Sequence, residues 1–170
     1  MMGKNFAVVM FIASVFCVAL PSVAAEKEGP AALAKALSEA SVLLDEGLKA
    51  SAREGKPISG KFELHEGALQ LSVYTMKGKK FSEVIVDHKT GSIKEAETIT
   101  DADDLKHARE QSRAMAKAKN SLATVVQRTV KANSGFRAVS AMPMLEAGQP
   151  VVEITLMNGA DVKKVTQKLK

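Results

Sequence analysis

Residues 81–91 read Phe-Ser-Glu-Val-Ile-Val-Asp-His-Lys-Thr-Gly, an apolar stretch that ends in an Asp-x-x-Thr-Gly turn. Residues 81–87 are expected to form a strand. Asp87 can accept hydrogen bonds from backbone N–H groups one to three residues later, Thr90 can do so more weakly, and Gly91 can adopt a positive φ. We interpret these three residues as shaping a strand-to-strand turn, in preference to binding a ligand.

The segments on both sides of this stretch also have the pattern of strands. Apolar and polar residues alternate over residues 61–65 and 69–74, which is typical of half-buried strands, and residues 92–99 follow the turn as a further strand. Every connection between these segments is short. The sequence therefore predicts an antiparallel meander of four strands.

A helix is expected before the first strand. Pro30 suits the first position of a helix, and an apolar stripe at spacings of three and four residues extends over 33–48. Gly55 and Pro57 would end the helix. The pattern predicts one amphipathic helix over residues 30–53.

A second helical region begins after Thr100–Asp104, where a Thr or Asp cap precedes further acidic residues. Its periodic stripe extends over 105–129, so that one helix could reach Ala132; alternatively, Asn120-Ser121 divides the region into two helices. Strands are then expected over 136–145, 150–157 and 162–169, the last two joined by a hairpin at Asn158-Gly159.

The two sheet segments match each other at an offset of 81 residues. Gly67 then lies opposite Gly148 and Gly78 opposite Gly159, and apolar strand positions fall opposite apolar strand positions. A match of composition alone would not also reproduce the two-residue phase of the strands. This similarity predicts an internal duplication.

The predicted fold class is therefore α+β, with two repeats that each lay an amphipathic helix on an antiparallel meander sheet of three to four strands. The first repeat covers residues 26–100 and the second covers 101–170. The second repeat is truncated, because it has no equivalent of the turn at 87–91 or of the strand after it.

This arrangement resembles the PepSY domain family, which is found in propeptides of thermolysin-like metallopeptidases and in envelope proteins. The resemblance rests on a helix that ends near Gly55, a strand that ends at 74–76, and the stretch Glu83–Gly91. It covers residues 41–97, and more weakly 120–169, where the Asp-x-x-Thr-Gly turn is missing. It implies a non-catalytic role: binding, and inhibiting or regulating, an envelope peptidase or another envelope protein through a sheet face, an edge strand or a helix–sheet groove.

Residues 1–25 have the features of a secretory signal peptide. Lys4 precedes an apolar run over 6–20, and Val23-Ala24-Ala25 supplies small residues for cleavage after Ala25. The run is shorter than the roughly 20 residues that span a bilayer. Cys17 could be a lipidation site, but bulky Phe16 precedes it and apolar residues follow, which favours the plain signal peptide. We expect a periplasmic or secreted protein with no membrane span after cleavage.

No constellation of catalytic or metal-binding residues is recognisable. The sequence contains no Gly-x-Ser-x-Gly elbow, no Walker loop and no Gly-x-Gly-x-x-Gly loop, and its single cysteine lies in the signal peptide. His65-Glu66 begins like the zinc motif His-Glu-x-x-His, but Leu69 stands where the second histidine is needed. His88 and His107 have no ligand spacing to His65. We therefore expect no enzyme activity, no metal and no cofactor.

Two groups of lysines are candidate contacts for an acidic partner. The chain carries a formal net charge of +5, and lysines are concentrated at one hairpin tip and in the last strand. The alternative is that these lysines protect exposed strands from edge-to-edge aggregation. The candidates are Lys77, Lys79 and Lys80 in the first group and Lys163 and Lys164 in the second.

The sequence favours a protein partner over nucleic acid. Aromatic residues make up only 4% of the chain, and the few in the mature part follow the core phase of strands, so no base-stacking surface is recognisable. A small-ligand carrier that uses the concave face of the sheet is the alternative function. Such a carrier would need a deep pocket lined by Leu, Val and Met with a few inward polar groups.

Overall fold

The computed structural model describes residues 29–170. The predicted signal peptide (1–25), its cleavage site and Cys17 lie outside the described residues.

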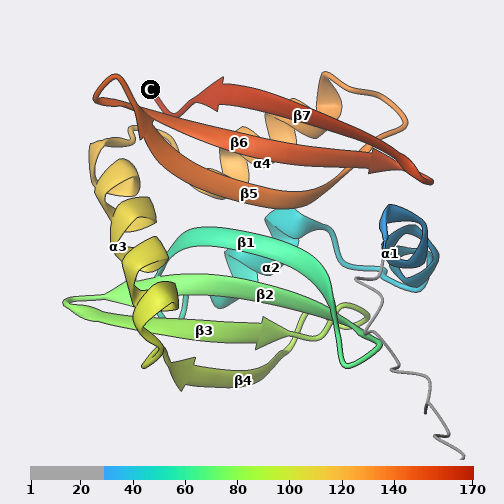
Figure 1. Ribbon diagram of the computed structural model, residues 1–170, viewed down its shortest axis with the longest axis horizontal. Helices are drawn as coiled ribbons and strands as arrows, with labels where there is room; N and C mark the ends of the chain where they lie inside the picture. The colour runs from blue at the N-terminus through green and yellow to red at the C-terminus, as the bar shows by residue number, and fades with distance from the viewer. Residues whose placement is uncertain (1–28) are drawn as a thin grey trace, which may run out of the picture.

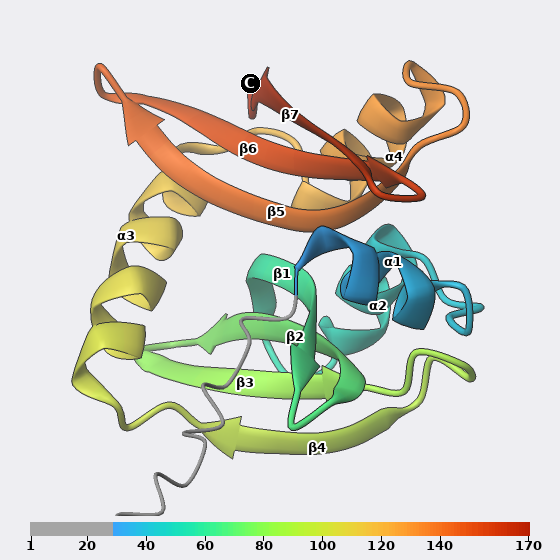
Figure 2. The same cartoon turned by 45° about the vertical axis from the view of Figure 1, so that its right-hand side comes forward.

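The described chain is an α+β protein with four helices and one seven-stranded antiparallel sheet, which confirms the predicted fold class. The strand order is β4-β3-β2-β1-β5-β6-β7. Helix α3 crosses one face of this sheet, and α2 and α4 cover the other (Figures 1 and 2). The helices are α1 (Pro30–Leu37), α2 (Leu44–Ser51), α3 (Ala102–Lys117) and α4 (Leu122–Lys131). The strands are β1 (Lys56–His65), β2 (Ala68–Lys77), β3 (Lys80–Val86), β4 (Ile93–Thr98), β5 (Arg137–Glu146), β6 (Gln149–Asn158) and β7 (Asp161–Lys168).

Strands β1 and β5 join two meanders into one sheet, a connection that the sequence did not predict. The pairing is short, with Gly60 opposite Ala141 and Lys61 opposite Ser140. A Cβ atom at Gly60 would lie 3.1 Å from Leu48 Cδ2, so the missing side chain lets α2 lie close over the junction. The glycine therefore serves close packing of helix on sheet.

The strand pairing of the two meanders is the same at the offset of 81 residues. Lys56 pairs with Met76 and Arg137 with Met157, and both first strands have a register shift one residue further on. The two turns at Glu66-Gly67 and Ala147-Gly148 have the same positive φ angles, within 4° of each other at each position. The helices follow the offset less closely, because α4 begins at Leu122 where the offset would place residue 125. A duplication of the whole helix-and-sheet unit stays a prediction.

The hydrophobic core lies between the sheet and the helices α2 and α4. Leu44 and Leu48 of α2 and Leu122 of α4 are almost fully buried, as are the strand residues that alternate toward them. The largest of these strand residues are Ile58, Leu71, Val73, Val84, Val86, Ile154 and Leu156.

The predicted single helix over 30–53 is wrong: the chain forms α1 and α2 with a break at 38–43. The backbone N–H groups of Ser41 and Val42 both donate to the carbonyl oxygen of His88, each at 3.0 Å. These bonds tie the break to the turn after β3. The periodic stripe is compatible with one helix, but contacts from a distant turn interrupt it.

Arg137, at the start of β5, donates hydrogen bonds to backbone carbonyl groups on both sides of this break. Its guanidinium donates to the carbonyl oxygen of Leu37 at 2.8 Å and to that of Val42 at 3.1 Å. It also lies over the ring of Phe62, 5.4 Å from the centroid. The local sequence around Arg137 does not indicate this role, because its partners lie about 100 residues earlier in the chain.

The helical region after residue 100 is two helices. Asp101 caps α3, because its carboxylate accepts from the N–H groups of Asp103 and Asp104. Ser121 caps α4 by accepting from Thr124 N at 3.1 Å. Of the two arrangements expected from the sequence, the structure shows the one in which Asn120-Ser121 divides the region into two helices. No helix in the part of the chain that the structure describes is long and apolar enough to cross a bilayer.

Candidate functional site

A groove of about 340 Å³ lies between α3 and the sheet face that it crosses, beside the junction of β1 and β5. Alternation along the strands turns Lys61, Ser72 and Tyr74 to this face, because their neighbours Phe62, Leu71 and Val73 point to the core. The wall from α3 consists of Asp104, His107, Glu110 and Gln111, and the wall from β5 of Met142, Pro143 and Met144.

Three polar contacts add to a narrow apolar stripe, Ala108, Ala114 and Met115, in holding α3 over the sheet. Ser59 Oγ donates to Gln111 Oε1 at 2.8 Å, and Lys56 Nζ donates to the carbonyl oxygen of Met115 at 2.8 Å. Lys117 Nζ donates to the carbonyl oxygen of Gly148 at 3.1 Å. Because these anchors lie toward the middle and C-terminal end of α3, its first turns leave the groove open.

The charge of the groove is mainly negative. Asp104 and Glu110 carry carboxylates into its wall, whereas Lys61 is paired with Glu63 at 2.6 Å. Burial, followed by the neighbouring Asp104 carboxylate, raises the pKa of Tyr74 well above its ordinary value of 10.0. The phenol is therefore a neutral hydrogen-bonding group at all ordinary pH values. The groove suits a ligand that brings positive charge or hydrogen-bond donors.

The acidic character continues along the same sheet face toward β4. A smaller hollow of about 170 Å³ is lined by Glu83, Glu95 and Glu97, together with His65 and Gln70. A hydrogen bond to Glu97 and its negative charge raise the pKa of Glu95. Within the described residues, no group of three or more His, Cys, Asp or Glu side chains is arranged to hold a metal ion.

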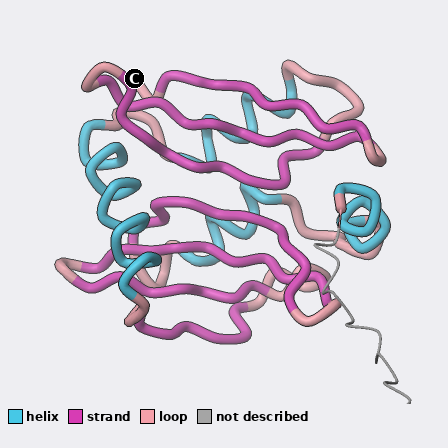
Figure 3. The backbone as a smooth tube through the Cα atoms, in the orientation of Figure 1, coloured by secondary structure: helices cyan, strands magenta, loops and turns pink. Residues whose placement is uncertain are grey.

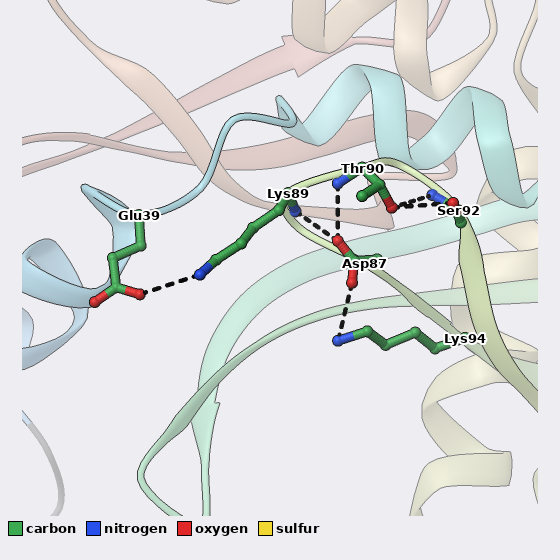
Figure 4. A network of polar contacts seen from close by, with 6 residues as sticks. All are labelled: Glu39, Asp87, Lys89, Thr90, Ser92 and Lys94. Atoms are coloured by element: carbon green, nitrogen blue, oxygen red, sulfur yellow. Dashed lines mark hydrogen bonds and ion pairs between the residues drawn. The ribbon is translucent and has the colours of Figure 1, made fainter.

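The turn residues Asp87 and Thr90 belong to a local network of polar contacts (Figure 4), and Gly91 N donates to Asp87 O at 2.8 Å beside it. Asp87 Oδ1 accepts from the N–H groups of Lys89 and Thr90, each at 2.8 Å, and Asp87 Oδ2 contacts Lys94 Nζ at 3.1 Å. The backbone bonds from Thr90 and Lys89 are the main reason that the pKa of Asp87 lies well below its ordinary value. Gly91 has a φ of 77°. The carboxylate is thus engaged within the turn.

The two predicted groups of lysines lie on the β2–β3 hairpin and at the start of β7, and β1, β5 and β6 separate these places in the strand order. Figure 1 shows the β2–β3 and β6–β7 hairpins on opposite sides of the molecule. Lys77, Lys79 and Lys80 surround a hollow of about 510 Å³ at the β2–β3 hairpin, with Phe81, Leu105 and Arg109 in its wall. Lys163 and Lys164 lie at the start of β7. An acidic partner that contacts one group does not contact the other unless it spans the sheet.

The groove residues Tyr74, Asp104 and Gln111 were not among the predicted site residues. Each has an ordinary local explanation, since Tyr74 lies in an expected strand and Asp104 lies at the acidic start of an expected helix. The signal in the sequence is that Ser112 and Lys119 interrupt the apolar stripe of 105–129, which is unusual for a helix that packs on a sheet.

No family model, curated protein or solved structure matches this chain. The resemblance to the PepSY family stays a prediction from the sequence.

Proposed function

We propose that this protein is an exported, non-catalytic binding protein that takes up a segment of an envelope protein in the groove between α3 and the sheet. The observation that carries the proposal is the groove itself, an open hollow of about 340 Å³ with a mixed polar and apolar wall. Asp104 and Glu110 favour a segment with Lys or Arg side chains, and Met142 and Met144 offer adaptable apolar contacts.

A peptidase is the class of partner to test first, because the resemblance of residues 41–97 to PepSY domains implies it. Binding would then inhibit or regulate that enzyme by occupying its surface. The acidic wall of the groove adds a preference for a basic surface on the partner.

A small-ligand carrier is the second candidate function. The volume of about 340 Å³ lies within the range of roughly 300–1,000 Å³ that is common for small-molecule sites, which favours this reading. The wall of the groove differs from the wall expected of a carrier, because its aliphatic side chains are only those of Met142, Pro143 and Met144. We therefore place the protein partner first.

The test is photo-crosslinking of the full chain in its own envelope. A photoreactive amino acid replaces Met144, which is 42% exposed at the rim of the groove, and, as a control, Leu43, which is 43% exposed in the α1–α2 break. We expect a defined crosslinked protein from position 144 only. The crosslink should be lost in Asp104→Asn/Glu110→Gln and kept in Asp103→Asn, which changes an exposed carboxylate in the same helix turn outside the groove.

Equal crosslinking from positions 144 and 43 would contradict a groove that selects its partner. A small molecule that stays bound in native mass spectrometry of the purified protein, and that the double variant releases, would favour the carrier. Export is tested separately, because an intact Met1 at the N-terminus of the envelope protein would refute cleavage after Ala25.

A further inference from the structure

Strand β7 is one of the two edges of the sheet, and among the described residues it pairs only with β6 (Figure 3). In the first meander the corresponding strand is β3, since Val73 pairs with Val84 as Ile154 pairs with Val165. Strand β3 is covered on its outer side by β4. The outer side of β7 is thus the place where the other meander carries a further strand.

The backbone of β7 offers hydrogen-bonding groups to such a strand. Leu169 N donates to Pro150 O, toward β6, so the residues in the opposite phase point their N–H and C=O groups outward. In the first meander the same phase is used, because Phe81 O accepts from Ile99 N beyond β4. The outward residues of β7 are therefore Val162, Lys164, Thr166 and Lys168.

The surroundings of this edge are basic. Lys163, Lys164 and Lys168 lie on β7, and a hollow of about 590 Å³ between α4 and β7 is lined by Arg128 and Lys170 besides Lys168. Among the described residues, Lys168, Lys170 and Arg128 form no ion pair, so their charge is available to a ligand. Val162 is 42% exposed on the same strand.

Strand β4 shows which side chains such a position accepts. Glu95 and Glu97 of β4 lie opposite Ile85 and Glu83 of β3, so two carboxylates face each other across the first meander. At the offset of 81 residues, the β7 residue in place of Glu83 is Lys164. Lys164 contacts Glu153 of β6 at 2.8 Å in an exposed ion pair, so an added carboxylate shares Lys164 with Glu153, and Lys168 is the lysine of β7 that has no ion pair among the described residues. A strand with the acidic pattern of β4 therefore meets positive charge on β7 and a like charge on β3.

We propose that the outer edge of β7 binds an extended acidic segment of a partner protein, which adds to the sheet as an eighth strand. The segment pairs antiparallel to β7, as β4 pairs with β3, and its carboxylates lie beside Lys164 and Lys168. This surface lies apart from the groove under α3, and its test does not depend on the function proposed for the groove.

The probe is a synthetic peptide with the sequence of residues 92–99, Ser-Ile-Lys-Glu-Ala-Glu-Thr-Ile, titrated up to millimolar concentration into the mature protein. Amide NMR spectra report which residues respond. We expect shifts confined to β7 and α4, and binding about three- to tenfold weaker for a peptide in which Gln replaces both Glu residues, as expected for the loss of two exposed charge pairs. Rising salt should weaken the acidic peptide more than the neutral one.

Two variants separate backbone pairing from charge. Thr166→Pro removes an outward N–H without touching the β6–β7 bonds, so it should weaken binding about tenfold or more, whereas Thr166→Ala should bind like wild type. Lys164→Gln/Lys168→Gln should weaken binding about three- to tenfold. The matched charge control is Lys77→Ser/Lys79→Ser/Lys80→Ser, at the opposite hairpin, which should leave binding unchanged. The unbound spectrum of each variant shows that it is folded.

The proposal is overturned by no shift at millimolar peptide, by equal binding of acidic and neutral peptides, or by full binding to folded Thr166→Pro. Self-association that salt abolishes, seen in sedimentation without peptide, would also overturn it, because a second copy would then be the occupant. The groove variant Asp104→Asn/Glu110→Gln should bind the peptide like wild type, so a failed groove and a failed edge are distinguishable.

Discussion

The meander of β1–β4 and that of β5–β7 have the same strand register and the same two kinds of hairpin turn. They differ in the elements that surround these strands. The first carries the Asp87 turn and β4; the second leaves the edge of β7 open. α1 has 8 residues, whereas α3 has 16 and crosses the sheet to reach both meanders. The common strands provide the scaffold, and both proposed binding surfaces lie where the two parts differ.

The largest effect is expected at the first residue of each meander. Lys56 and Arg137 are equivalent at the 81-residue offset, and both donate to backbone carbonyl groups of the helical segments. Arg137→Met removes the hydrogen bonds to the carbonyl groups of Leu37 and Val42, of which only that of Leu37 keeps a backbone donor among the described residues, Ala40 N. It should cost about 2–3 kcal/mol, whereas Lys56→Met removes one bond and should cost about 0.5–1 kcal/mol.

Urea unfolding measures both values. Arg137→Lys is the control, because it keeps the charge but cannot reach two carbonyl groups at once, and it should fall between Arg137→Met and wild type. Equal losses for Arg137→Met and Lys56→Met would show that the two meanders anchor their helices in the same way.

The next effect concerns the turn that only the first meander contains. Gly91 has a φ of 77°, and a Cβ atom there would meet nothing closer than Val42 Cγ2 at 3.7 Å. The cost of a side chain is therefore conformational: about 1 kcal/mol for Gly91→Ala and about 2 kcal/mol for Gly91→Val, which is β-branched. Gly67→Ala, also at a φ of 77° in a hairpin that both meanders share, is the control for thermal melts. A loss for Gly91→Ala far above that for Gly67→Ala would mean that a distorted turn also weakens the bonds from Ser41 and Val42 to His88 in the α1–α2 break.

Asp87 should make the first meander sensitive to acid. Its pKa is lowered in the folded protein, so its stabilisation is present above the ordinary value of 3.8 and is lost as the pH falls below it. Asp87→Asn keeps the shape of the side chain without the charge. The difference in Tm between wild type and Asp87→Asn should be largest near neutral pH and should shrink toward zero in acid.

The control for this series is Asp161→Asn, in the β6–β7 hairpin, where the carboxylate accepts no hydrogen bond from the described residues. Its Tm should follow wild type across the same pH range. A Tm difference for Asp87→Asn that does not change with pH would assign the role of Asp87 to shape alone.

The sequence predicted the sheet well because strands and hairpins are specified locally. The expected strand over 150–157 is β6 (Gln149–Asn158), and the Asn158-Gly159 hairpin lies where the dipeptide indicates. The first helix was predicted wrongly for the opposite reason. Its break is held by His88 and Arg137, which are distant in the sequence, and no periodicity reports such contacts.

The groove could not be predicted because it depends on long-range packing. Tyr74, Asp104 and Met142 belong to three elements that meet only because β1 pairs with β5 and α3 crosses that junction. Each residue has an ordinary local explanation. Only the polar residues within the stripe of α3 indicate in the sequence that this helix does more than pack on the core.

The smallest expected effect is spectroscopic and probes the groove directly. Tyr74 is the only tyrosine of the chain, so the near-ultraviolet absorbance of its phenolate reports this residue alone, and the equivalent position in the second meander is Thr155. Because its pKa is raised in the folded protein, ionisation should begin well above pH 10.0, and the stability that the buried phenol contributes should be lost as the pH rises beyond that value. Asp104→Asn should lower the midpoint only in part, since burial is the larger cause and stays in place. Asp103→Asn should leave the midpoint where it is in wild type. A wild-type midpoint at 10.0 would mean that the phenol is solvated and that α3 does not enclose the groove. Tyr74 would then differ from Thr155, its equivalent in the second meander, in residue type but not in burial under α3.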